Sequence, residues 1–236
     1  MSSNETSGQS ALSTSRLETL TDGIFAIAMT LLVLNLQVPQ IPAALVAARL
    51  PHELGALWPK VLSFVLSFVV VGVYWVGHHN QFHYIRRVDR SFMWINILFL
   101  LAIAFIPFSA GLLGAFVRQQ LVVAIYGLNL VAVGATLSLI WWYATTDHRL
   151  VDADLPPQAV RAGGRRILLG VGLYLLAVAL VFVNTWLSVA LYILVPILYI
   201  LPGRIDRHLQ GRPPAVEPSG ASDTSIASER YIDELH

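Results

Sequence analysis

Asp22 has the strongest claim to a chemical role in this sequence, because it is a carboxylate at the entrance of a long apolar segment. No charged residue follows it until Arg49. An acid at the edge of a membrane is costly without hydrogen-bond donors around it, and such residues often mark functional sites. Possible donors at the same predicted depth are His78, His79, Trp94 and Asn96. The pattern predicts a polar network that fixes one arrangement of helices, although ordinary residues at the level of the lipid headgroups would give the same pattern.

The other reactive residues do not form the motif of an enzyme. The chain has no cysteine, which excludes disulfides, thiolate zinc ligands and a thiol nucleophile. No serine–histidine nucleophile motif is present, and no apolar segment contains a pair of carboxylates, so we expect no catalytic residues and no enzyme. His79 and His83 have the i,i+4 spacing of a helical metal-binding pair. Because no third ligand accompanies them, we predict no metal site.

The composition of the chain indicates the class of protein that positions these residues. Of 236 residues, 56% are hydrophobic and only 12% are charged, whereas soluble domains carry about 25% charged residues. We therefore predict an all-α, polytopic membrane protein. The formal net charge of +1 argues against a nucleic-acid partner, which requires a concentrated basic face. Membrane lipid is the expected surrounding.

The first predicted membrane helix contains Asp22 and runs from Arg16 to the proline at position 39. Ser15 and Glu18 have capping-box spacing, and a proline ends a helix because it has no N–H to donate. The 23 residues before that proline rise about 34 Å, enough to cross a bilayer core. Residues 1–15 are polar and predicted to be flexible. The acidic residues in and around this segment argue against a cleaved signal peptide.

Five further apolar segments predict six membrane helices in residues 16–202. The connection over residues 39–59 holds several prolines and room for a short surface helix, and the last two spans are predicted to form a tight hairpin. The later spans are predicted at about 58–77, 91–113, 119–143, 167–185 and 186–201. Every connection is too short for a soluble catalytic domain. Residues 203–236 are rich in proline, serine and acidic residues and are predicted to be a mostly disordered tail.

The distribution of basic residues predicts the orientation of these helices. If the amino terminus is cytoplasmic, all 15 Lys and Arg residues except Arg49, Lys60 and Arg118 fall on the cytoplasmic side. Loops rich in Lys and Arg stay in the cytoplasm. Both termini are therefore predicted to be cytoplasmic, in a multi-pass protein of the cell membrane.

Two stripes of side chains run along the first predicted helix. The apolar stripe consists of Ile27, Leu31 and Leu34, and the stripe of small residues consists of Gly23, Ala26 and Thr30. Small residues suit close contact between membrane helices. The apolar stripe is typical of packing against lipid or other helices, and it also fits a hydrophobic constriction that controls an ion path by dewetting. Periodicity alone does not choose between these interpretations.

The segment Arg16-Leu-Glu-Thr-Leu-Thr-Asp22 resembles the signature of the endolysosomal transmembrane potassium channels, which reads arginine, three variable residues, phenylalanine, serine and aspartate. The run from Tyr74 to Phe108 also resembles the second and third helices of the bacterial branch of that family, and the resemblance covers roughly residues 15–202. Leu20 and Thr21 depart from the signature. Thr21 keeps the hydroxyl group of the serine, whereas Leu20 lacks the aromatic ring of the phenylalanine.

The resemblance implies a homotetramer in which the first helix of each six-helix chain lines a central pore for potassium, with no cofactor. It implies a constriction at Ile27, Leu31 and Leu34, and an influence of Thr30 on the preference for potassium. A polar network would hold the pore helix without touching the ion. Its implied members are Arg16, Thr21, Asp22, one or both of His78 and His79, Trp94 and Asn96.

The resulting hypothesis is a potassium-permeable cation channel of modest selectivity. The chain has no TVGYG-like loop, which in ordinary potassium channels supplies a filter of backbone carbonyls. The alternative is a proton-coupled secondary transporter. Such a protein is expected to carry ionisable groups at mid-membrane depth and broken helices. The predicted spans carry no such groups between their entrances, and Pro107 and Pro196 are the only breakers inside them.

Overall fold

The computed structural model describes the backbone of residues 3–201 and the side chains of residues 14–201. Helices make up this part of the chain, joined by short turns and one isolated β-bridge between Ile85 and Val151. The α-helices are α1 (Ser3–Leu31), α2 (Val46–Ala56), α3 (Trp58–Phe82), α4 (Arg90–Phe116), α5 (Gln120–Thr145), α6 (Pro157–Leu180) and α7 (Thr185–Ile200). Three 3-10 helices complete the elements: η1 (Leu32–Asn35), η2 (Ala43–Leu45) and η3 (Thr146–His148). The predicted disordered tail lies outside the described residues.

Five helical segments in this part of the chain are long and apolar enough to cross a membrane. They are Thr14–Asn35, which combines most of α1 with η1, and α3, α4, α5 (extended through η3) and α6. The predicted sixth span corresponds to α7, which is apolar but has only 16 residues. Its rise of about 24 Å is less than the thickness of a bilayer core. The all-α, polytopic architecture is confirmed, with five long spans and one short apolar helix.

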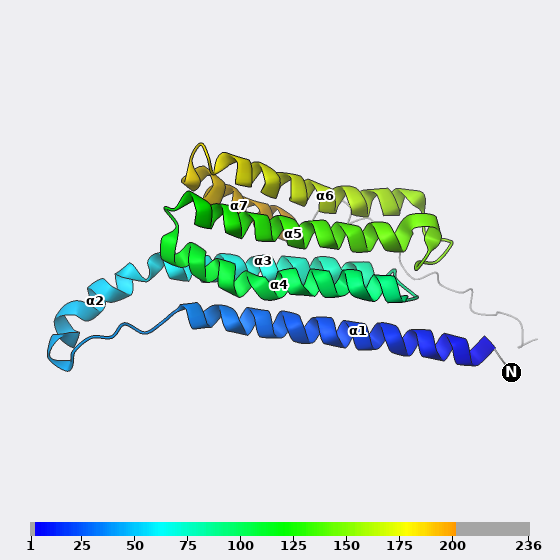
Figure 1. Cartoon of the computed structure of the whole chain (residues 1–236), viewed down its shortest axis with the longest axis horizontal. Coiled ribbons are helices and arrows are strands. Elements are labelled where there is room, and N and C mark those ends of the chain that lie inside the picture. Colours follow the sequence, from blue (N-terminus) through cyan, green and yellow to red (C-terminus); the bar gives the residue numbers. More distant parts are fainter. Residues whose placement is uncertain (1–2, 202–236) are drawn as a thin grey trace, which may run out of the picture. The chain divides into compact units, whose positions relative to one another are not determined.

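The helices pack as a layered bundle, with α3, α4 and α5 between α1 and the pair α6 and α7. Figure 1 shows α1, in blue, beside α3 and α4, while α6 and α7 lie beyond α5. The core contains large side chains with no exposed surface, including Phe92, Phe99, Tyr126 and Tyr192. Thus α1 and its continuation η1 contact the bundle on one side only, through α3 and α4.

The ends of the first helix differ from the prediction. The α1 helix already begins at Ser3 and includes most of the segment predicted to be flexible, so Ser15 lies inside the helix and is not its N-cap. The carbonyl of Ser15 instead accepts a hydrogen bond from Thr19 Oγ1 at 2.9 Å. At the other end, α1 tightens into η1 after Leu31, and Leu36 leaves the helical region with φ −91° and ψ 76°. The helix therefore ends before the proline that was predicted to stop it.

The connection after η1 forms a helix that the bundle does not cover. It contains η2 and α2, and neither element has a buried residue. The sequence left room for a short surface helix in this connection. The structure therefore confirms that the segment between the first two spans lies outside the core.

Three polar side chains of α3, spaced seven residues apart, hold α3 and α5 in one register. Each forms a buried hydrogen bond with α5: Ser67 with the Tyr126 hydroxyl (3.0 Å), Tyr74 with the Leu130 carbonyl (2.8 Å) and Gln81 with the Leu137 carbonyl (3.2 Å). Partners on both helices advance in the same direction along the chain, so α3 and α5 run parallel. Polar groups in the bundle interior are thereby satisfied by neighbouring helices, as a membrane environment requires.

Gly127 on α5 offers a test of this packing. A Cβ atom at this position would lie 2.6 Å from Val178 Cγ2 and would overlap the hydroxyl of Tyr192, which is itself fully buried and bonded to the Val123 carbonyl at 3.1 Å. Gly127→Ala is therefore expected to destabilise the fold by about 1–3 kcal/mol through overpacking. Thermal unfolding of the purified protein in detergent measures the effect. The matched control is Gly172→Ala, where nothing lies within 4 Å; equal melting temperatures for the two variants would contradict the packing described.

Candidate functional site

The α1 helix has one buried face and one exposed face. The buried face follows a helical repeat and packs against α3 and α4; it consists of Leu17, Thr21, Phe25, Ala28 and Leu32. Spacings of three and four residues place such side chains on one side of a helix. All other side chains described on α1 and η1 are exposed or partly exposed. The bundle therefore orients α1 and leaves its opposite side open.

A buried polar network joins α1, α3 and α4. Asn96 Nδ2 donates to Thr21 Oγ1 at 3.2 Å, and Asn96 Oδ1 lies 2.9 Å from His78 Nε2. All three side chains are at least 97% buried. The His78 ring stacks between Phe82 and Phe99, at centroid distances of 4.3 and 5.1 Å. Asn96 thus uses both ends of its amide group to connect the first helix to the bundle.

Asp22 lies beside this network and has a different partner from those predicted. Its Oδ1 accepts a hydrogen bond from Trp75 Nε1 at 2.9 Å, and the carboxylate is exposed in the single chain. The Trp75 ring stacks on His79 with a centroid distance of 5.6 Å. The prediction that His78, His79, Trp94 or Asn96 would donate to Asp22 is therefore wrong. The indole of Trp75 fills that role, and His79 supports the indole.

Trp94 and Arg16 lie outside the network. Trp94 is 59% exposed on α4, and no hydrogen bond within the described part of the chain joins it to Thr21, Asp22 or His78. Trp94 precedes Asn96 by two residues, which corresponds to about 200° around a helix, so both side chains cannot face α1. Arg16 is likewise exposed. Trp75 could have been found from the sequence, because it lies one turn before His79 on the same helix face.

The predicted constriction residues lie on the open side of α1. Ile27, Leu31 and Leu34 are 55%, 42% and 67% exposed, and none belongs to the core of its own chain. Thr30 is also exposed, and its Oγ1 donates to the Ile27 carbonyl at 2.8 Å. This hydrogen bond leaves the hydroxyl oxygen with acceptor capacity. The apolar stripe is therefore available to lipid or to another copy of the chain.

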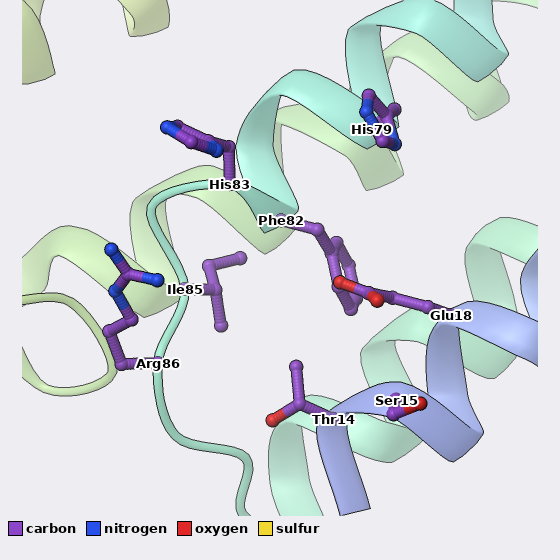
Figure 2. A pocket seen from close by; sticks show the side chains of 8 residues that line it. All are labelled: Thr14, Ser15, Glu18, His79, Phe82, His83, Ile85 and Arg86. Atoms are coloured by element: carbon purple, nitrogen blue, oxygen red, sulfur yellow. The ribbon is translucent and has the colours of Figure 1, made fainter. Parts of the chain in front are cut away.

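A cavity of about 380 Å³ lies between α1 and the end of α3. Figure 2 shows Glu18 with Thr14 and Ser15 on α1, facing the side chains of α3 and the loop after it. The lining residues are Thr14, Ser15, Glu18, His79, Phe82, His83, Ile85 and Arg86. His79 and His83 thus share one cavity. Within residues 14–201, no group of three His, Cys, Asp or Glu side chains is placed to hold a metal ion.

Comparison with known proteins assigns this arrangement to a family. The family model of the endosomal/lysosomal potassium channel TMEM175 matches residues 16–107, the part that carries the second half of α1, α3, the polar network and most of α4. The chain is 37% identical over 188 residues to a potassium channel of Streptomyces collinus, covering 78% of this chain and 90% of that protein. It is 35% identical over 191 residues to a potassium channel of Chamaesiphon minutus, covering 80% and 94%.

The fold agrees with a solved structure. The crystal structure of a lysosomal potassium-selective channel TMEM175 homolog from Chamaesiphon minutus superimposes with a TM-score of 0.71 at 34% sequence identity. The match covers 79% of this chain and 96% of that one, so it extends beyond the family signature to nearly all of the bundle. The predicted resemblance is confirmed: the chain belongs to the family of the endosomal/lysosomal potassium channel TMEM175.

Proposed function

We propose that this chain forms a potassium-permeable channel in which four copies of α1 surround a central pore. The observation that carries the proposal is the open face of α1 and η1, on which Ile27, Leu31 and Leu34 are exposed while the face that packs against α3 and α4 is buried. A single bundle with a filled core has no internal water path. Because the open face is the one surface that α1 offers to a partner, symmetric association of copies would place it at the axis.

The names of relatives support potassium as the permeant ion. Two proteins that this chain matches over more than three quarters of its length are named potassium channels, and the solved homolog from Chamaesiphon minutus is described as a potassium-selective channel. No charged side chain lies between Asp22 and Arg49. The proposed pore wall thus contains no fixed charge that would trap a cation.

The proposed constriction controls permeation through hydration. A narrow ring of aliphatic side chains excludes water, and an ion can pass only where water or polar groups replace the lost hydration shell. Thr30 lies between Ile27 and Leu31 on the exposed side of α1, so its hydroxyl oxygen can face a passing ion. We expect modest preference for potassium over sodium, with Thr30 influencing that preference.

The polar network is proposed to hold the pore helix in its rotational setting. Thr21, Asn96 and His78 are buried away from the open face of α1, so they act on the position of α1 and not on the ion. Asp22 and Trp75 form a second tie between α1 and α3 near the same level. Both termini are proposed to be cytoplasmic, which places the Asp22 end of the pore on that side.

Potassium flux into liposomes tests the proposal. Purified wild-type protein in liposomes is expected to dissipate a potassium gradient even when no proton gradient is present. The rate of potassium flux is expected to rise with potassium concentration without saturating. A coupled transporter would instead show saturable exchange that depends on a proton gradient. Leu34→Ala is expected to change the potassium flux because it widens the proposed constriction. Absence of potassium flux through protein of normal assembly would overturn the proposal.

A further inference from the structure

Asn35 ties the far end of the pore helix to α4. It is the last residue of η1 and follows Leu34 directly. Its Nδ2 donates a hydrogen bond of 3.0 Å to the carbonyl of Pro107, in the middle of α4. This contact joins residues 72 positions apart in the chain. It lies at the opposite end of the pore helix from the network of Thr21.

Gly111 creates the space for this contact. In an α-helix the Pro107 carbonyl already accepts from the N–H four residues later, and its second lone pair remains free for another donor. A Cβ atom at position 111 would lie 2.5 Å from Asn35 Oδ1 and 3.0 Å from its Cγ. Any larger residue would therefore push the Asn35 amide away from α4. Gly111 thus leaves the Pro107 carbonyl accessible, and Asn35 donates a hydrogen bond to that carbonyl.

The geometry of η1 connects this contact to Leu34. A 3-10 helix has three residues per turn, so residues i and i+3 lie on the same side. Leu32 and Asn35 have this spacing, and Leu32 is fully buried. The two side chains anchor the turn to the bundle and leave Leu34 pointing outward, 67% exposed. None of residues 36–57 is buried, so Asn35 is the last anchor before the uncovered connection.

We propose that Asn35 is a positioning residue that sets the direction of Leu34 and thereby the shape of the constriction at this end of the pore. The inference rests on the proposed pore function, because it assigns a role within that pore. The hydrogen bond and the close packing at Gly111 act together. Loss of either one frees η1 to rotate and Leu34 to leave the axis.

A double-mutant cycle with a cross-linking readout tests the role of Asn35. The chain has no cysteine, so Leu34→Cys introduces a single thiol, and oxidation forms a disulfide between copies only where the thiols approach one another. Adding Asn35→Ala is expected to slow this cross-linking about threefold, the size expected from losing one hydrogen bond between membrane helices. Adding Gly111→Ala instead should have the same effect, because its methyl group displaces Asn35.

The combination of both substitutions distinguishes positioning from general damage. With Asn35→Ala present, the methyl group of Gly111→Ala no longer meets the amide, so the double variant is expected to match the single ones. The same variants without the cysteine should change the potassium-to-sodium permeability ratio, while the control Gly172→Ala should not. Unchanged cross-linking in both single variants, or fully additive effects, would overturn the inference.

Leu34→Ala separates the role of Asn35 from the pore assignment. If it alters permeation while the Asn35 and Gly111 variants alter neither cross-linking nor permeability, the role of Asn35 is wrong and the pore assignment stands. If Leu34→Ala leaves permeation unchanged, the pore assignment itself fails, and the role of Asn35 fails with it.

Discussion

Replacing Ile27 by asparagine is expected to raise the single-channel potassium conductance and to lower the preference for potassium over sodium. The amide group would hydrate the proposed constriction, which aliphatic side chains are expected to keep dry. Lowering the permeation barrier by about 1.4 kcal/mol would increase the conductance roughly tenfold. Planar bilayer recordings measure the conductance, and the reversal potential between potassium and sodium solutions measures the selectivity.

The control for this prediction is an exposed apolar residue far from the proposed pore. Ile27 and Leu176 are 55% and 50% exposed, and Leu176 lies on α6, which does not pack against α1. Ile27→Ala is expected to widen the constriction and change the conductance, whereas Leu176→Ala should leave permeation as in wild type. Identical currents through the two variants would show that Ile27 faces lipid.

Asn96→Leu is expected to cause the largest loss of stability among substitutions near α1. The leucine has a similar volume but cannot donate to Thr21 or accept from His78. Each buried polar group left without a partner costs about 1–3 kcal/mol, and this substitution leaves two. We expect a large drop in the melting temperature and a low yield of the assembled protein, measured by thermal unfolding and size-exclusion chromatography in detergent.

Trp94→Leu is the matched control because Trp94 is exposed on the same helix. It is expected to melt close to wild type. Asp22→Ala should fall between the two, since the Asp22 carboxylate is exposed and loses one hydrogen bond, from Trp75. Wild-type stability of Asn96→Leu would contradict the buried network of Thr21, His78 and Asn96.

The sequence predicted the spans well because long apolar runs bounded by polar residues determine which helices cross a membrane. The starts of α3 and α5 lie within one residue of their predicted positions, whereas α6 begins at Pro157, ten residues before the predicted start of the fifth span. Predicting the open face of α1 was harder, because periodicity assigns Ile27, Leu31 and Leu34 to one stripe without saying what that stripe faces. The burial of Phe25 and Ala28 against α3 and α4 resolves which side of α1 belongs to the bundle.

The network was predicted in part, for a reason that lies in helix geometry. The depth in the membrane predicted from the sequence placed His78 and Asn96 at the same level, and the two side chains are in contact. Depth does not say, however, in which direction around its helix a side chain points. Trp94 has the right depth and the wrong direction, whereas Trp75 lies one turn deeper and reaches Asp22. The role of Asn35 had no sequence signal, because its partner is a backbone carbonyl uncovered by a glycine in another helix. Such contacts become visible only when the helices are packed.

Thiol modification of Ile27→Cys under current recording tests the central claim most directly. The chain has no other cysteine, so a water-soluble, charged thiol reagent can react only at this position. If four copies of α1 line the pore, the reagent is expected to reduce the potassium current, and a reducing agent should restore it. Unchanged current, with mass spectrometry showing a fully modified cysteine, would contradict the account by placing Ile27 away from the ion path.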